Sequence, residues 1–148
     1  MYLYIFPEVM IMNMEKFTIK AREALKNSLD EALQRGQQEV DVAHLVYSLL
    51  SDPDGVCSTL LKKAGMDTAD LKIQLNDKLE KMPKVSGGPV QPYLSAKLNS
   101  LLAGAEKEAR KMKDEYVSVE HLLLAAVDSG EEILSEALNV RNITKDRL

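Results

Sequence analysis

The sequence predicts an all-α domain made of a duplicated four-helix unit, about eight helices with pseudo-twofold symmetry. The first observation is that residues 115–127 have a degenerate copy at 39–50, with His121 matching His44 (121 − 44 = 77). The same offset pairs like residues from Thr18 onward, among them Leu25 with Leu102, Ala32 with Ala109 and Leu61 with Leu138. A register kept this far without a gap indicates an internal repeat.

Composition is the second observation. Aromatic residues make up 5% of the chain and Trp is absent, so aliphatic residues must form the core, which favours packed helices over a sheet. A length of 148 residues is that of one domain. A net charge of −4 gives no basic footprint for nucleic acid, and the lone Cys57 excludes an internal disulfide and fits a reducing, cytoplasmic setting.

The first eleven residues are apolar but carry neither a basic leader nor a cleavage site, and they are too few to span a membrane. Because Met12 and Met14 follow directly, we expect residues 1–11 to be a non-native or flexible extension upstream of the natural start. The alternative is a β-like tail that pairs with a neighbouring chain. The domain proper is then expected to cover residues 12–148.

Caps and breaks define the helices of the first repeat, about residues 17–82. Thr18 is the expected N-cap of the first helix, which carries small apolar residues at three-and-four spacing and ends at Gly36. Asp41 starts the second helix, which runs to about Ser51 before a turn at 52–55. The third and fourth helices are expected at 56–64 and from 67 or 68 to about 82.

Residues 83–93 hold three prolines and two glycines, so they are expected to form a linker. The second repeat, about 94–148, begins with a cap at Ser95 and a helix from Leu98 to about Met112. Ser118 caps the sixth helix, and Glu131 or Glu132 starts the seventh. Thr144 is expected to cap an eighth, with the natural chain continuing past Leu148.

His44 and His121 occupy matching places three residues after their caps, where an imidazole reaches back to the backbone of the preceding loop. Packing and capping explain both. A metal site is not expected, because the chain has two His and one Cys and lacks HExxH or CxxC spacing. Cys57 stands among apolar residues and is expected to be buried and inert.

Asp114, Glu115 and Glu120 form an acidic cluster where the sixth helix is predicted to begin. Such a cluster interacts favourably with the helix dipole. It could also form a hydrogen-bonding rim beside an apolar groove that accepts basic or apolar extended segments. The chain has no nucleophile, Walker or dinucleotide motif, so neither catalysis nor a cofactor is expected of this chain.

In these residues the chain resembles the Clp N-terminal domain family. The resemblance covers Met12 to Leu148 and rests on four segments: Phe17–Leu25, Leu60–Gly65, and the paired segments Val40–Leu45 and Tyr116–Ala125. The linker with Gln91-Pro92-Tyr93 is most similar to the ClpB-type disaggregase branch. The first repeat departs from the Gly-Thr-Glu-His-like motif of the ClpC and ClpA branch, because Ala43 precedes His44.

The resemblance implies a module without catalytic activity at the front of a ring-forming ATPase, which would use ATP and Mg and form a hexamer in the full-length protein. It implies binding of exposed apolar segments of unfolded or aggregated polypeptides, with a co-chaperone or adaptor as a further partner, and with neither nucleic acid nor membrane. Thr18, Asp114 and Glu120 match the family's substrate-handling positions. Thr18 and Glu120 lie at helix starts, where they could act by capping instead. The groove is expected where the first helix of one half meets the other half.

Two alternatives remain open. One is an adaptor- and substrate-docking domain of a ClpC/ClpA-like unfoldase that serves a protease. The other is a small hydrolase that uses His121 with Glu120 or Asp114, for which the sequence offers no nucleophile motif.

Overall fold

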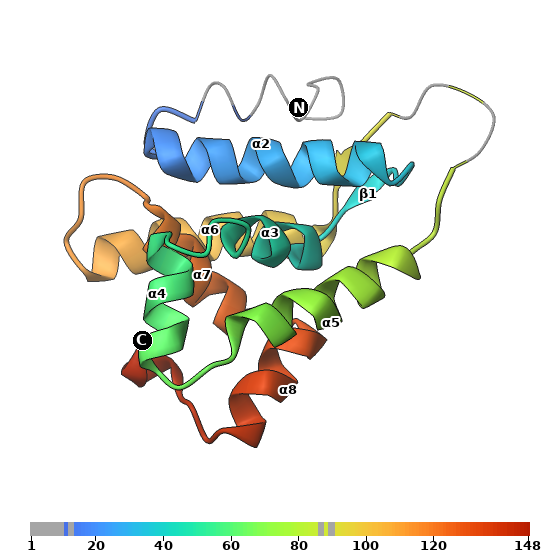
Figure 1. Ribbon diagram of the computed structural model, residues 1–148. Coiled ribbons are helices and arrows are strands. Elements are labelled where there is room, and N and C mark those ends of the chain that lie inside the picture. Colours follow the sequence, from blue (N-terminus) through green and yellow to red (C-terminus); the bar gives the residue numbers. More distant parts are fainter. Residues whose placement is uncertain (1–10, 12–13, 86–87, 89–90) are drawn as a thin grey trace.

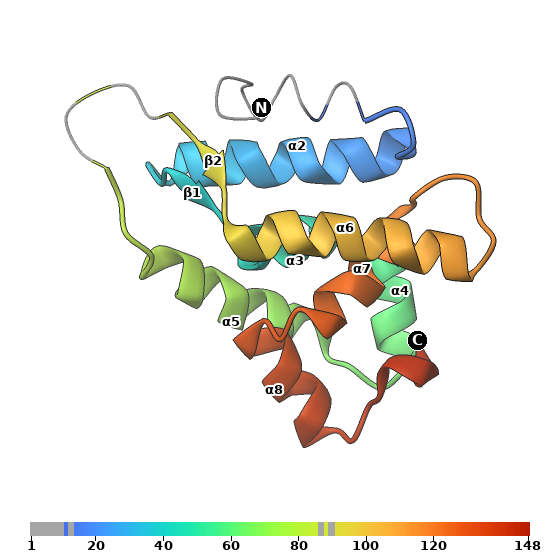
Figure 2. The ribbon, with the colours of Figure 1, turned by 180° about the vertical axis from the view of Figure 1, so that it is seen from behind.

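The computed structural model describes residues 11, 14–85, 88 and 91–148. In this part of the chain seven α-helices carry the fold, which confirms the all-α prediction. Their bounds are α2 (Ile19–Gln34), α3 (Val42–Leu49), α4 (Val56–Lys63), α5 (Thr68–Glu80), α6 (Ala96–Lys111), α7 (Val119–Asp128) and α8 (Glu132–Val140). Helix α2 lies along one side of the molecule, α3 and α6 lie next to it, and α5 and α8 lie on the far side (Figures 1 and 2).

The duplication predicted from the sequence is present in three dimensions. Helices α2 and α6 begin at residues 19 and 96 and end at 34 and 111, so both ends keep the offset of 77. The chain leaves both helices through a left-handed residue, Gly36 with φ 70° and Lys113 with φ 58°. Glycine takes this conformation without a steric penalty and lysine does not, so the second repeat keeps the turn although its sequence no longer favours it.

A very short parallel sheet, which was not predicted from the sequence, joins the halves. Strand β1 (Glu39–Val40) pairs with β2 (Tyr93–Leu94), and Phe17 forms an isolated parallel bridge to Val117. The offset of 77 relates the Val40–Leu94 pair to the Val117–Phe17 pair. In each half, therefore, the segment before the first helix pairs with the segment before the second helix of the other half.

Four predicted helix starts are confirmed by side-chain caps. Thr18 Oγ1 accepts from Ala21 N at 3.1 Å, and Ser95 Oγ accepts from Leu98 N at 3.0 Å. Because Ser95 is the cap, α6 begins at Ala96, two residues before the predicted start. Asp67 and Glu131 cap α5 and α8 in the same way.

The eighth helix is the clearest difference from the prediction. Residues Lys145–Arg147 form a single 3₁₀ turn after Thr144, because too few residues follow in this sequence to build an α-helical hydrogen-bond ladder. The Lys145 ammonium is bonded to Glu108 and, at 2.6 Å, to Asp128, which holds the turn against α6 and α7. Hydrogen bonds to Asp128 and then to Glu108 raise the pKa of Lys145.

The ends and the linker complete the fold. Residues 1–10 lie outside the described part of the chain, so the prediction of an extension there stays a prediction; Ile11 is buried in the core. The described residues of the 83–93 linker contain no helix. No helix in the described ranges is both long and apolar enough to cross a bilayer.

Candidate functional site

The first predicted site residue, Thr18, lies at the contact between the halves. Its side chain caps α2, as described above, and its backbone N–H donates to Val117 O at 2.9 Å. The matching bond in the other half runs from Ser95 N to Val40 O, also at 2.9 Å. Thr18 thus has a structural role that is sufficient to explain its presence.

Asp114 and Glu120 flank the start of α7 and are joined through Ser118 and His121. The Ser118 N–H donates to His121 Nδ1 at 2.8 Å, and His121 Nε2 lies 2.8 Å from Asp114 Oδ2. The Ser118 hydroxyl donates to Glu120 Oε2 at 3.1 Å. The His121 side chain is buried while that of Asp114 is 46% exposed. The buried imidazole therefore holds a carboxylate that faces solvent.

The first half contains a buried version of the same arrangement. The Asp41 N–H donates to His44 Nδ1 at 2.9 Å, and His44 Nε2 lies 2.7 Å from Gln37 Oε1. The amide of Gln37 in turn donates to Leu79 O of α5. Burial lowers the pKa of His44 to about 4, partly opposed by nearby Asp41. Both histidines therefore anchor the start of a helix, as the sequence indicated.

Ser118, His121 and Asp114 lie in a row that resembles a hydrolase triad, since Ser118 Oγ is 3.0 Å from His121 Nδ1. A general base needs a free lone pair facing the nucleophile. The His121 Nδ1 lone pair already accepts the backbone N–H of Ser118. The matching row in the first half has Asp41 in place of the serine and Gln37 in place of the aspartate. The row is thus a repeated structural feature, and it does not support the hydrolase alternative.

Cys57 and the possible metal ligands were the other candidates for chemistry. Cys57 is buried, and burial, followed by nearby Glu120, raises the pKa of its thiol to about 12. A thiol with so high a pKa is not a nucleophile at neutral pH. Within the described ranges, His, Cys, Asp and Glu side chains form no group of three that could hold a metal ion.

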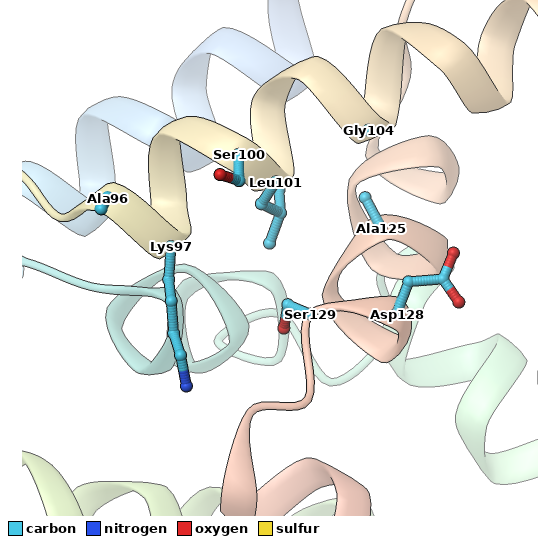
Figure 3. A pocket seen from close by; sticks show the side chains of 8 residues that line it. All are labelled: Ala96, Lys97, Ser100, Leu101, Gly104, Ala125, Asp128 and Ser129. Carbon is cyan, nitrogen blue, oxygen red and sulfur yellow. The ribbon is translucent and has the colours of Figure 1, made fainter.

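A groove of about 340 Å³ lies between α6 and the end of α7 (Figure 3). Among the described residues its walls are mostly small, and the charged ones are Lys97 and Asp128. Ala96, Ser100 and Gly104 follow at intervals of four along α6, and Gly104 lies against Ala125 of α7. At the same place in the first half the offset of 77 puts the larger Ile19, Glu23 and Asn27, so the open groove belongs to the second half.

A second hollow, of about 520 Å³, lies on the other side of α6, against the segment before α2. Helical spacing of 100° per residue puts its wall residues Leu102 and Glu106 opposite those of the groove, with Ala103 between the two faces. It is the hollow nearer to the predicted location, where the first helix of one half meets the other half. Three of its seven lining residues are charged, Glu15, Lys16 and Glu106, which makes it less suited to apolar ligands.

The structure brings Thr18, Asp114 and Glu120 together around the start of α7 but places the groove at the far end of that helix. Sequence reasoning therefore missed the groove residues. The available signal was the pair of small residues Ser100 and Gly104, four apart in the fifth predicted helix, with Ala96 four residues earlier. Such a pattern leaves room over a helix face because side chains are short there.

Fold and groove together define a class: a small, duplicated, all-α domain with a shallow open groove. The chain belongs to the Clp repeat N-terminal domain family, whose model matches residues 16–140. It is 35% identical over 135 residues to the chaperone protein ClpB of Bacteroides thetaiotaomicron, a match that covers 91% of this chain and 15% of that protein. The chain thus spans about one-seventh of the length of this relative.

Solved structures share the fold. The Hsp104 N-terminal domain from Candida albicans matches with a TM-score of 0.72 at 23% identity, covering 90% of this chain and 86% of that one. A ClpV N-domain in complex with a VipB peptide matches with a TM-score of 0.73 at 20% identity, covering 91% and 83%. These identities establish the common fold only.

Proposed function

We propose that this chain is the substrate-binding N-terminal domain of an ATP-dependent, ClpB-like chaperone of the cytoplasm. It would engage exposed apolar segments of unfolded or aggregated proteins, which the ATPase ring of the full-length hexamer then threads, using ATP and Mg. The similarity to ClpB chaperones supports the branch, and the peptide-bound ClpV domain supports the kind of ligand. The single observation that carries the proposal is the apolar groove between α6 and α7.

The groove is suited to weak and general binding. Its walls are open and mostly apolar, and burial of apolar surface contributes roughly 25 cal/mol per Å² without demanding a particular sequence. A module tethered near a pore gains from a high effective concentration, so modest affinity is enough. Asp114 and Glu120 would add an acidic rim for basic side chains beside the apolar segment, with Thr18 positioning the start of α7 against α2.

The test uses two neighbouring positions on α6 that face different hollows. Gly104→Gln fills the groove, since a Cβ at residue 104 would stand 3.8 Å from Ala125 Cβ, an ordinary contact that the fold tolerates. Ala103→Gln places the same side chain in the second hollow. We expect Gly104→Gln to weaken binding of a labelled, permanently unfolded protein by on the order of tenfold and Ala103→Gln to leave it unchanged, measured by fluorescence anisotropy.

The opposite result, with only Ala103→Gln impairing binding, would move the binding site to the second hollow and leave the function standing. If the wild-type chain showed no saturable binding of unfolded protein while a folded adaptor bound well, the adaptor-docking alternative of the ClpC/ClpA type would replace the proposal.

A further inference from the structure

A third cavity, of about 330 Å³, lies between the end of α3, helix α4 and the start of α5. It shares no lining residue with the groove between α6 and α7, and the cluster at the start of α7 does not line it. Two lysines line it, Lys62 from α4 and Lys72 from α5. Among the described residues neither ammonium has a carboxylate within 4 Å. Lys62 Nζ donates to Pro53 O at 2.9 Å, and Lys72 Nζ lies 5.1 Å from the Tyr47 ring centroid.

The start of α5 adds hydrogen-bond donors to the same cavity. Its first backbone N–H groups, those of Thr68 and Ala69, have no acceptor among the described residues, as is usual in the first turn of a helix. The side chain of Thr68 lines the cavity although the residue is only 8% exposed, and its hydroxyl has no partner in the described part of the chain. The hydroxyl oxygen itself is not sealed off from solvent, so it is available to a ligand that enters the cavity.

The internal repeat offers a comparison. The offset of 77 puts Lys145 at the place of Thr68 and Asp128 at the place of Ser51, which also lines the cavity. In the second half this spot is closed by the bonds from Lys145 to Asp128 and Glu108. In the first half the corresponding space is open, and its charged groups are mainly positive.

We propose that this cavity binds a phosphate group, either the free ion or a phosphorylated side chain. Helix N-termini and lysines both favour phosphate, through oriented N–H groups and through a compact positive charge. Asp67 is the acidic residue among the described lining residues, and its Oδ1 accepts from Asp70 N at 3.0 Å as the helix cap. Its charge lowers the affinity for an anion, which makes the substitution of Asp67 an informative test.

The experiment is a titration of the ¹⁵N-labelled chain followed by two-dimensional NMR. Inorganic phosphate and a short phosphoserine peptide are compared with sodium chloride at equal ionic strength and with the same peptide unphosphorylated. We expect the amide signals of Thr68 and Ala69 to shift saturably with a phosphorylated probe. Saturation by phosphate alone assigns the free ion as the source, and saturation by the peptide alone assigns the modified side chain. Shifts reproduced by chloride, or absent with both probes, overturn the proposal.

Variants separate binding from general charge effects. Lys62→Met and Lys72→Met should each weaken binding roughly tenfold, and Lys63→Met, an exposed neighbour on α4, should leave it unchanged. Asp67→Asn keeps a cap but removes the carboxylate, so it should strengthen binding severalfold, a gain that loss of structure could not produce. An equal loss in Lys63→Met, or no gain in Asp67→Asn, would contradict the site.

Discussion

At the scale of single residues, the two histidines show how a repeated contact adapts to its surroundings. His44 and His121 make the same bond to the backbone of their caps, yet the partner of the second ring nitrogen is Gln37 in one half and Asp114 in the other. The amide suits the interior beneath α5, where a carboxylate would lose its hydration. The carboxylate suits the exposed loop before α7.

The buried His44 predicts a pH dependence of stability. Its folded pKa of about 4 lies below the unfolded value of 6.5, so between these values the unfolded state binds a proton that the folded state does not. The free energy of unfolding should therefore fall as pH falls from 6.5 to 4, by about 3 kcal/mol from this group. Urea denaturation at several pH values measures it.

His44→Gln provides the control for that prediction. The variant should be less stable at pH 7, because one flexible amide does not reproduce the ring that bridges the Asp41 N–H and Gln37, and its stability should decline less steeply between pH 6.5 and 4. Parallel curves for the variant and the wild type would show that His44 is not the group responsible.

Two substitutions of Thr18 separate its role as the cap of α2 from a direct contact with a bound polypeptide. Thr18→Ala should lower the free energy of unfolding by about 1 kcal/mol because it removes the cap, whereas Thr18→Ser keeps the accepting oxygen and should be nearly neutral. If the affinity for unfolded protein falls only in the variant whose free energy of unfolding falls, Thr18 acts by capping α2. A stable Thr18→Ser variant with impaired binding would instead reveal a direct contact by the methyl group.

At the scale of elements, α5 and α8 are joined by the ion pair between Lys78 Nζ and Glu131 Oε2 at 2.5 Å. The Glu131 side chain is only 2% exposed and also caps α8 through Oε1. One buried carboxylate thus both starts a helix and fastens it to the other half of the molecule.

Removing one partner of that pair should be more harmful than removing both charges. Lys78→Met leaves the buried carboxylate of Glu131 unpaired and should cost about 2 kcal/mol, less than for a fully buried pair because Lys78 is partly exposed. Adding Glu131→Gln should recover part of the loss, since the amide oxygen can still cap α8. Thermal and urea unfolding of the wild type, the two single variants Lys78→Met and Glu131→Gln, and the double variant give the coupling energy; strict additivity would mean that the pair does not interact.

At the scale of the whole molecule, the halves depend on each other. Backbone bonds from Thr18 to Val117 and from Ser95 to Val40 cross between them, and the Ser95 hydroxyl donates to Asp41 Oδ1 at 2.7 Å. Each half thereby completes the start of the other half's helices, so the repeat is a symmetry within one domain.

We expect that fragments 14–85 and 91–148 do not fold separately. Each should show much less helix by circular dichroism than the intact chain, and mixing them should restore helical signal in a concentration-dependent way. The intact chain should unfold in one cooperative transition. A sharp, independent melting transition in either fragment would contradict this interdependence.

The sequence by itself determined the helical class, the offset of 77 and most helix starts, because caps, glycines and apolar spacing act within a few residues of one another. It also placed both histidines correctly as anchors. Only the tertiary structure decided the two-residue strands, the 3₁₀ turn at Lys145 and the groove beside Gly104. Each of these depends on which distant segments meet and how large their side chains are. The spacing of residues within one segment does not predict such contacts.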